Sequence, residues 1–285
     1  MKYITMYLSL AKPRVLALVG LTALGTAVVA ARGGIPLSAG LYLTLAILLG
    51  SAGAAYLNNF MDRDIDAIME RTRARPLPRG AVRPGLVFLI GLVLIAVSIP
   101  LALQLNYLVA IFVTAGAVIY SLVYTLWLKR RTSMNIVIGG VAGSCAVLAG
   151  WYAVSTGLSS TPVLLALLVF LWTPSHFWSL AMVHRDSYQE ARVPMLPVAI
   201  SPGRTATYIV LSSVLLLICS VVIYFTGDFH GLYLVGAIVL GVLFLASCVR
   251  LWKRPVRDRA WLNFKLSGVY LLGLFLVLML DVTIY

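Results

Sequence analysis

Charged residues are scarce in this chain: they make up 11% of its 285 residues, and only nine are acidic. Ordinary soluble domains contain about a quarter charged residues, so the composition argues against a water-soluble globular protein. Three cysteines in so long a chain exclude a disulfide-rich scaffold. The 61% hydrophobic content and the mean hydropathy of +1.00 exclude a disordered chain and favour a polytopic membrane protein.

Nine apolar runs are long enough to cross the roughly 30 Å hydrocarbon core of a bilayer as helices. They lack the period-two alternation of a transmembrane β-barrel, and the first is too long for a signal-peptide core. We therefore predict an all-α membrane protein with nine transmembrane helices, in a single domain of residues 1–285. The runs lie near residues 14–32, 38–60, 84–103, 107–127, 134–154, 163–183, 206–225, 232–251 and 262–281.

The basic residues gather on one side of the predicted membrane. With the N-terminus inside, 20 of the 22 Lys and Arg residues fall in inner segments; Arg32 lies outside and Lys265 lies within the last run. This positive-inside pattern predicts a cytoplasmic N-terminus, and it explains most of the +13 net charge without a nucleic-acid partner. We expect a multi-pass protein of a prokaryotic plasma (inner) membrane, with a site that opens on the cytoplasmic side.

Charged landmarks recur at an interval of 124 residues. Four pairs share it: Asp62 and Asp186, Asp66 and Glu190, Lys129 and Lys253, and Arg130 and Arg254. Each unit contains four apolar runs, and an even number makes the repeats parallel to one another. The sequence therefore predicts two parallel four-helix repeats plus one extra helix.

Asn58, Asp62 and Asp66 follow one another at four-residue intervals near the end of the second run. On a helix this spacing places them on one face, whereas Asp64 falls off that face and is expected to be an ordinary surface charge. Hard oxygen ligands on one face suit Mg²⁺, which takes one or two carboxylates plus substrate phosphates. The alternative is a solvated helix end balanced by arginines. The apolar surroundings, where carboxylates are costly, favour the metal.

Basic groups and a second acidic segment extend this pattern. Arg71 and Arg75, four residues apart, can present two guanidinium forks to phosphate oxygens, although such arginines also anchor membrane proteins. Asp186 and Glu190 repeat the four-residue acidic spacing and could hold a second Mg²⁺ on the same diphosphate. The basic loop at 129–131 adds positive charge. Cations of this kind stabilise a departing diphosphate.

His176 lies well inside the sixth run. Such a histidine is either a hydrogen-bonded packing residue or a ligand of haem iron, and the residues alone leave both interpretations open. His184 and His230 lie outside the runs. The cysteines, which have no metal-ligand spacing, are expected to be small core residues; they are Cys145, Cys219 and Cys248.

Three motifs resemble the UbiA superfamily of intramembrane prenyltransferases: N-x-x-x-D-x-x-x-D at 58–66, R-T-x-x-R-P at 71–76 and Y-T-x-x-L-K-R at 124–130. Three further segments resemble its haem-prenylating branch: L-A-K-P-R-V at 10–15, T-P-S-H-F-W at 173–178 and V-P-M-L-P at 193–197. The resemblance spans essentially the whole chain and implies nine helices around a central cavity. One departure is the second acidic motif, which is D-x-x-x-E instead of a pair of aspartates.

The resemblance implies a Mg²⁺-dependent transfer of a farnesyl group from farnesyl diphosphate to a vinyl group of haem b, with addition of water, giving haem O and diphosphate. It implies metal binding through the diphosphate by Asn58, Asp62, Asp66, Asp186 and Glu190. It implies diphosphate binding by Arg71, Arg75, Lys129 and Arg130. His176 would contact the haem, Tyr124 would face the allylic cation, and a haem A synthase could receive the product.

Two other functions remain open at this stage. A sister enzyme that prenylates an aromatic acid or a quinone precursor would share every diphosphate residue and differ only on the acceptor side. An ion-coupled transporter would also have parallel repeats and membrane carboxylates. Transporter sites usually lie near the bilayer midplane, whereas these carboxylates cluster at the inner interface, which favours an enzyme.

Overall fold

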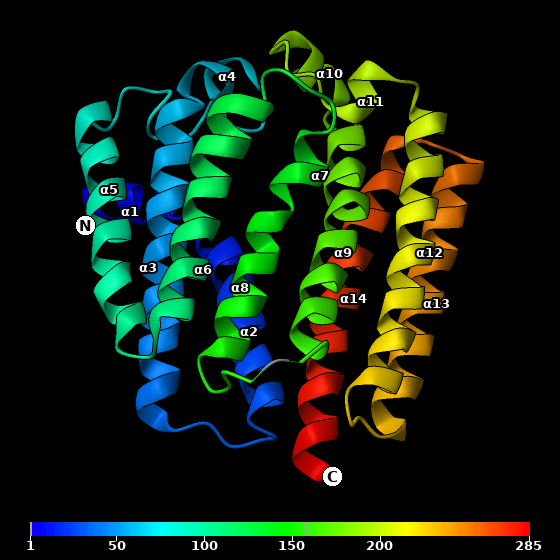
Figure 1. Cartoon of the computed structure of the whole chain (residues 1–285). Helices are drawn as coiled ribbons and strands as arrows, with labels where there is room; N and C mark the ends of the chain where they lie inside the picture. Colours follow the sequence, from blue (N-terminus) through cyan, green and yellow to red (C-terminus); the bar gives the residue numbers. More distant parts are fainter. Residues whose placement is uncertain (1, 158) are drawn as a thin grey trace.

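The computed structural model describes residues 2–157 and 159–285, which form a bundle of long helices (Figure 1). Within these ranges there is no strand, and nine helical spans are long and apolar enough to cross a membrane. The predicted all-α membrane fold is therefore confirmed. The spans are Pro13–Ala30, Leu37–Met61, Pro84–Leu103, Tyr107–Leu128, Asn135–Tyr152, Thr161–Val183, Pro202–Thr226, Gly231–Lys253 and Arg257–Ile284.

Six of the spans are single α-helices that follow the predicted runs closely. They are α2 (Pro13–Ala30), α3 (Leu37–Met61), α5 (Pro84–Leu103), α9 (Thr161–Val183), α12 (Pro202–Thr226) and α13 (Gly231–Lys253). The last helix, α14 (Arg257–Ile284), begins five residues before the predicted run and includes Arg257 and Arg259. Short helices flank the spans: α1 (Lys2–Leu10), α4 (Arg63–Ile68), α10 (Arg185–Glu190) and α11 (Leu196–Ala199).

The two remaining spans change geometry along their length. The fourth begins as α6 (Tyr107–Val118) and continues as a π-helix, η1 (Ile119–Leu128). The fifth is divided into α7 (Asn135–Gly139) and α8 (Val141–Tyr152). A Cβ atom on Gly139 would lie 2.7 Å from the Tyr124 ring, so the glycine allows α7 to approach η1 closely. Periodicity along the sequence predicted neither irregularity.

The long helices pack in two groups. In the N-terminal half, α3 packs on α5, α5 on α6, and α6 on α8; in the C-terminal half, α9, α12, α13 and α14 pack in a closed ring. Helix α2 contacts α3, α8 and α14, and therefore joins the two groups, while α8 also packs on α9. The division of the chain into two parallel four-helix repeats plus one extra helix stays a prediction.

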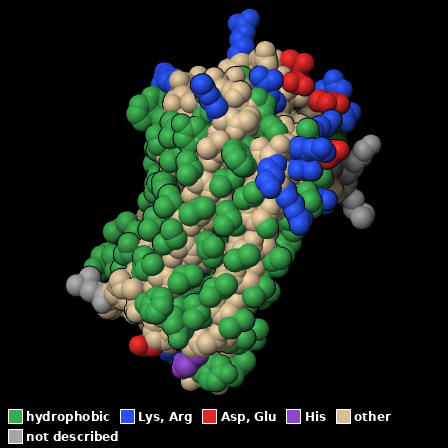
Figure 2. Space-filling view, turned by 90° about the vertical axis from the view of Figure 1, so that its right-hand side faces the viewer, with side chains coloured by type: hydrophobic (Ala, Val, Ile, Leu, Met, Phe, Trp, Pro, Cys, Tyr) green, Lys and Arg blue, Asp and Glu red, His purple; other side chains and the backbone are tan. Residues whose placement is uncertain are grey.

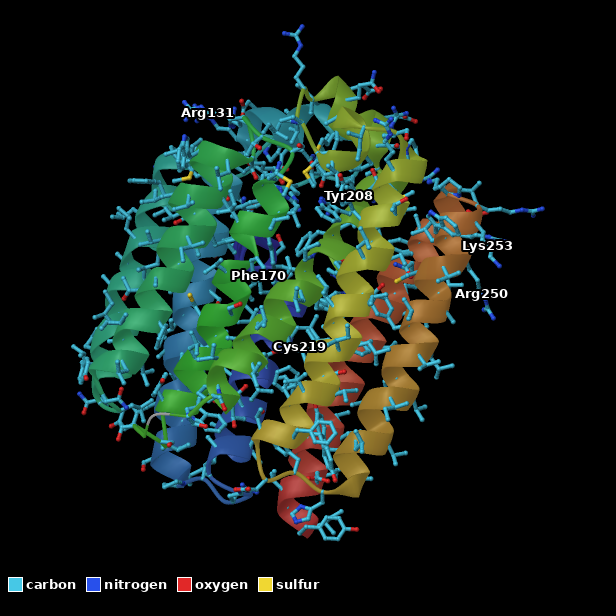
Figure 3. The ribbon with its side chains drawn as sticks, turned by 45° about the vertical axis from the view of Figure 1, so that its right-hand side comes forward. Arg131, Phe170, Tyr208, Cys219, Arg250 and Lys253 are labelled. Atoms are coloured by element: carbon cyan, nitrogen blue, oxygen red, sulfur yellow. The ribbon has the colours of Figure 1, made fainter. Side chains whose placement is uncertain are left out.

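Charge gathers at one end of the bundle. Figure 2 shows Lys, Arg and most of the acidic side chains at the upper end, above a flank of hydrophobic side chains. Arg131, Arg250 and Lys253 lie in the same half of the molecule as α4 and α10 (Figures 1 and 3). Large hydrophobic side chains such as Leu89 and Leu243 remain exposed on the outer helix faces, as expected of a lipid-facing surface. The chain is a multi-pass membrane protein.

Candidate functional site

Asn58, Asp62 and Asp66 are buried side by side where α3 passes into α4. Their exposed fractions are 3%, 2% and 3%. The backbone bonds from Asp62 N to the Asn58 carbonyl (2.9 Å) and from Asp66 N to the Asp62 carbonyl (2.7 Å) keep helical spacing across the junction. Asn58 Nδ2 also donates to Asp62 Oδ2 at 2.7 Å. Asp64 is 60% exposed in its side chain, so it lies off the buried face as the spacing predicts.

Each member of this buried face has a cationic partner from another part of the chain. Lys129 Nζ lies 2.6 Å from Asp62 Oδ2, and Arg75 Nη1 lies 2.7 Å from Asp66 Oδ2. Lys12 donates a hydrogen bond to Asn58 Oδ1. The free energy of burying two carboxylates is high unless they are paired and hydrogen-bonded, and these contacts provide the pairing.

The π-helix η1 brings a set of polar groups to the same place. Its wider turn gives backbone bonds between residues five apart, as from Lys129 N to the Tyr124 carbonyl at 2.8 Å. The Thr125 hydroxyl donates to the Tyr120 carbonyl at 2.8 Å and accepts from Asn58 Nδ2 at 2.9 Å. The Tyr120 and Tyr124 rings stack with centroids 5.9 Å apart. Lys129 thus follows directly after a π-helix whose side chains contact the buried face of Asn58, Asp62 and Asp66.

Two lysines, the half-buried Lys12 and the buried Lys129, border the carboxylates, and their pKa values shift in opposite directions. Burial, together with the charge of Arg75, lowers the pKa of Lys12 to about 7. Burial is the largest single influence on Lys129 and opposes its charge, but Asp62, Tyr188 and Asp66 together raise the pKa of Lys129 above its ordinary value. Lys12 also has a left-handed backbone conformation, with φ of 57°, which a non-glycine residue rarely adopts outside constrained sites. Its Nζ lies 3.1 Å from the Tyr120 hydroxyl.

The donor set at this face fits a divalent cation that is shared with a ligand. Asp62 Oδ1 is buried without a hydrogen-bond partner in the described chain, which is unusual for a carboxylate oxygen. Among the described residues, no three His, Cys, Asp or Glu side chains form a complete metal cage. Mg²⁺ usually takes one or two protein carboxylates and completes its shell with water and phosphate oxygens. The amide oxygen of Asn58 accepts a hydrogen bond from Lys12. To ligate the metal, this oxygen would have to give up that hydrogen bond.

The second acidic segment has a different environment. Asp186 and Glu190 lie on α10, both side chains are exposed, and neither has an ion pair or hydrogen bond within the described residues. Tyr188 between them is buried in the same hydrophobic cluster as Ile65 and Met69 of the first segment. Figure 1 shows α4 and α10 at the same end of the bundle. The fold therefore brings the two segments to one end, without a described contact between their carboxylates.

The predicted phosphate-binding residues divide between the site and the surface. Arg71 is exposed and lines a pocket together with Arg75 and Lys12. The Thr72 hydroxyl donates to the Asp66 carbonyl at 3.1 Å, which folds this loop back toward the acidic face. Arg130, in contrast, makes two 2.7 Å bonds to the carboxylate of Asp64 on the surface. Helical spacing predicts a surface position for Asp64 but does not predict its pairing with Arg130.

An apolar cavity of about 280 Å³ lies between the helices, bordered by Lys12, Tyr120 and Tyr124 of the polar site. His176 on α9 lines the same cavity. Its ring stacks on Trp172 with centroids 4.3 Å apart and packs on Phe264 at 4.5 Å. The cavity thus extends from Lys12, which contacts Asn58 of the buried carboxylate face, to the intramembrane histidine.

Sequence reasoning missed Lys12, Tyr120 and Thr125 as site residues. Lys12 and Thr125 stand in the motifs at 10–15 and 124–130 that carry the resemblance, but neither was given a role in the site. Tyr120 lies four residues before Tyr124 within an apolar run, outside every recognised motif. The roles of Tyr120 and Thr125 depend on the π-helix, for which the sequence carries no evident signal.

Comparison with known proteins agrees with this geometry. A model described as the UbiA prenyltransferase family matches residues 18–277. A protein named protoheme IX farnesyltransferase from Desulforudis audaxviator is 44% identical over 279 residues, which cover 97% of this chain and 88% of that protein. A protein of the same name from Symbiobacterium thermophilum is 42% identical, with 97% and 94% coverage.

Two solved structures share the fold at low identity. A digeranylgeranylglyceryl phosphate synthase is 18% identical, with a TM-score of 0.84 and full coverage of both chains. A UbiA homologue from Archaeoglobus fulgidus bound to GPP and Mg²⁺ is also 18% identical, with a TM-score of 0.66 and 96% and 99% coverage. At these identities the likeness concerns the arrangement of the helices.

Proposed function

The chain belongs to the UbiA prenyltransferase family, and we propose that it transfers a farnesyl group from farnesyl diphosphate to a vinyl group of haem b, with addition of water. The products are haem O and diphosphate. The observation that carries this proposal is the buried, cation-paired face of Asn58, Asp62 and Asp66. It is linked to an apolar cavity through Lys12, which contacts Asn58 and lines that cavity. The full-length similarity to proteins named protoheme IX farnesyltransferase supports the choice of acceptor.

Mg²⁺ is the metal that suits these ligands. We assign one Mg²⁺ to Asp62 and Asp66, with Asn58, on one side of the diphosphate. We assign a second Mg²⁺ to Asp186 and Glu190 of α10, on the other side. When bound, Mg²⁺ neutralises negative charge on the diphosphate and so makes it a better leaving group. The buried Asp62 Oδ1, which has no partner in the described chain, is the first oxygen available for this role.

The basic side chains around the acidic face bind the diphosphate. Arg75 and Lys129 already lie at the carboxylates, and Arg71 lines an adjacent pocket together with Arg75 and Lys12. Arg130 would join only after leaving its surface pair with Asp64. Charge-assisted hydrogen bonds from these groups stabilise the oxygen that becomes anionic when the bond to the farnesyl carbon breaks.

The cavity houses the carbon chemistry. Cleavage of the bond between C1 and oxygen releases diphosphate and leaves an allylic cation. The vinyl group of haem b attacks C1 with its π electrons, and water captures the cation that forms next to the porphyrin, then loses a proton. The Tyr124 ring, on the cavity wall beside the acidic face, is placed to stabilise the allylic cation. We assign His176, farther along the wall, to contact with the haem.

The cellular setting follows the charge distribution. We propose that the charged end of the bundle faces the cytoplasm of a prokaryote, because most of the basic residues gather there. Farnesyl diphosphate, which carries a polar head on an apolar tail, would enter from that side with its head at the acidic face. A haem A synthase is the partner that would consume the product.

The test is an acceptor competition. Purified protein receives farnesyl diphosphate and Mg²⁺ with haem b and 4-hydroxybenzoate side by side, and the products are separated by mass. We expect farnesylated, hydrated haem alone. Prenylated 4-hydroxybenzoate would replace this proposal with the quinone-precursor branch, and the absence of any prenyl transfer would contradict an enzyme. In cells, haem O should accumulate only when the chain is expressed.

A further inference from the structure

A buried serine on α14 contacts the histidine that lines the cavity. His176 Nδ1 lies 2.6 Å from Ser267 Oγ, and Ser267 is fully buried. The Ser267 hydroxyl lies 2.6 Å from the Phe264 carbonyl, one turn earlier in the same helix. Trp172, which stacks on the histidine, donates its indole N–H to the Ser267 carbonyl at 2.7 Å. These contacts tie α9 to α14 at one point beside the cavity.

The hydrogen-bond inventory at Ser267 decides where the histidine proton lies. A serine hydroxyl has one proton to donate, and a backbone carbonyl can only accept. The 2.6 Å contact with Phe264 therefore takes the hydroxyl proton. The equally short contact with His176 is then a hydrogen bond only if Nδ1 carries a proton and donates it to Ser267 Oγ. A hydroxyl directed at Nδ1 would instead leave two oxygens 2.6 Å apart with no proton between them.

The protonation of Nδ1 has a consequence for the other ring nitrogen. A neutral imidazole has one N–H, so Nε2 keeps its lone pair. No described residue makes a hydrogen bond to Nε2, and the ring borders the cavity. Trp172 on one side and Phe264 on another restrict rotation of the ring. In metal-binding histidines, a hydrogen bond from one nitrogen commonly orients the other toward the metal.

We propose that Ser267 is a positioning residue that holds His176 as the Nδ1–H tautomer, so that Nε2 is available to ligate the iron of the haem substrate. This inference rests on the proposed function, because it takes haem as the acceptor. It concerns the serine and the tautomer: Ser267 touches no substrate itself and acts through His176.

The tautomer can be measured without any substrate. Nitrogen-15 NMR of labelled histidine in the purified, ligand-free protein distinguishes a protonated ring nitrogen from one with a lone pair. The chain has three histidines, and the signal lost in His176→Ala assigns the relevant one. We expect proton-bearing Nδ1 in the wild type and a shift of the proton toward Nε2 in Ser267→Ala. A wild-type ring protonated at Nε2 would overturn the proposal.

The iron contact is tested by comparing two porphyrins. Ser267→Ala should weaken binding of haem b about 10- to 100-fold, the usual effect of losing a group that orients a ligand, and alter its Soret band. Binding of iron-free protoporphyrin IX and of farnesyl diphosphate should be unchanged. Equal loss for haem and protoporphyrin, or no loss for either, would overturn the proposal. His176→Ala should reproduce the selective loss.

Two further variants separate tautomer control from packing. Ser98→Ala is the matched control, since Ser98 is fully buried and its hydroxyl donates to the carbonyl of Ile95, three residues earlier, at 2.7 Å. It should leave haem binding unchanged. Replacing His176 by Nδ-methylhistidine within Ser267→Ala blocks the wrong tautomer and should restore haem binding; failure to restore it would count against the proposal. Wild-type protein that ligates haem but never farnesylates it would refute the proposed function instead.

Discussion

The two acidic segments share a spacing but differ in how the fold treats them. In the first, Asp62 and Asp66 are at most 3% exposed and each is paired with a cation. In the second, Asp186 and Glu190 are exposed on α10 and have no ion pair within the described residues. The carboxylates of the first segment are therefore compensated by cations of the folded chain itself, whereas those of the second have no counter-charge among the described side chains.

Because of this difference, removing a carboxylate should affect stability differently in the two segments. Removing one member of a buried ion pair leaves an uncompensated charge and destabilises the fold. Removing an exposed, unpaired carboxylate takes away no contact of the folded chain. If both segments bind metal, both losses reduce turnover, but only a change in the first segment should also reduce stability.

Metal removal should have the largest effect on turnover and a small one on folding. EDTA is expected to abolish farnesyl transfer, and added Mg²⁺ or Mn²⁺ should restore it. The temperature of unfolding should change little, because Lys129 and Arg75 already compensate Asp62 and Asp66. Product formation and thermal unfolding of one sample provide both readings. Full turnover in metal-free buffer would refute the metal site.

Asp62→Ala should reduce both turnover and stability. Loss of one strong electrostatic contact at a reacting centre costs about 10²- to 10³-fold in kcat. The buried Lys129 would lose its partner, at a cost of about 3–5 kcal/mol in the free energy of unfolding. Asp66→Ala should reduce turnover similarly but stability less, because the Arg75 side chain it frees is 27% exposed and can be solvated. Steady-state kinetics and denaturant unfolding of the detergent-solubilised protein measure the two effects, and an unchanged stability would contradict the pairing.

Asp186→Ala and Glu190→Ala should reduce turnover alone. We expect a loss of about 10- to 100-fold, smaller than at Asp62, because these carboxylates face water, where electrostatic interactions are weaker. The Mg²⁺ concentration needed for half-maximal rate should rise. Stability should equal that of the wild type. Wild-type kinetics in both variants would remove α10 from the metal site and leave a single metal-binding segment.

Asp64→Ala is the control within the first segment and should have the smallest effect. Its exposed pair with Arg130 contributes less than about 1 kcal/mol, and turnover should remain near that of the wild type. A loss comparable to that of Asp62→Ala would refute the assignment of one functional face.

The same pair has a defined pH dependence. The hydrogen bond from Arg130 lowers the pKa of Asp64 from 3.8 to about 2. A carboxyl whose pKa falls on folding stabilises the protein above its unfolded pKa, and this contribution is lost as the pH falls through the folded value. The small stability difference between wild type and Asp64→Ala should therefore persist above pH 4, shrink as the pH falls through about 2, and vanish below that value. A difference that persisted there would contradict the pair.

The sequence determined the elements whose cause is local or set by the solvent. Nine apolar runs of bilayer length predict nine spans, because the chain must satisfy its backbone hydrogen bonds within each span. The four-residue spacing of Asn58, Asp62 and Asp66, with Asp64 out of phase, follows from helical geometry alone. For this reason the shared face of Asn58, Asp62 and Asp66 and the surface position of Asp64 could be predicted.

Only the tertiary structure decided which groups meet. Lys12 and Lys129 reach the carboxylates from elements far along the chain, Arg130 turns to Asp64, and Ser267 meets His176 across 91 residues. The π-helical turn that places Thr125 against Asn58 also depends on packing between spans. Helical periodicity is set by backbone geometry within a few residues of the chain. Which side chains pair with one another depends on how the helices pack, and that packing exists only in the folded chain.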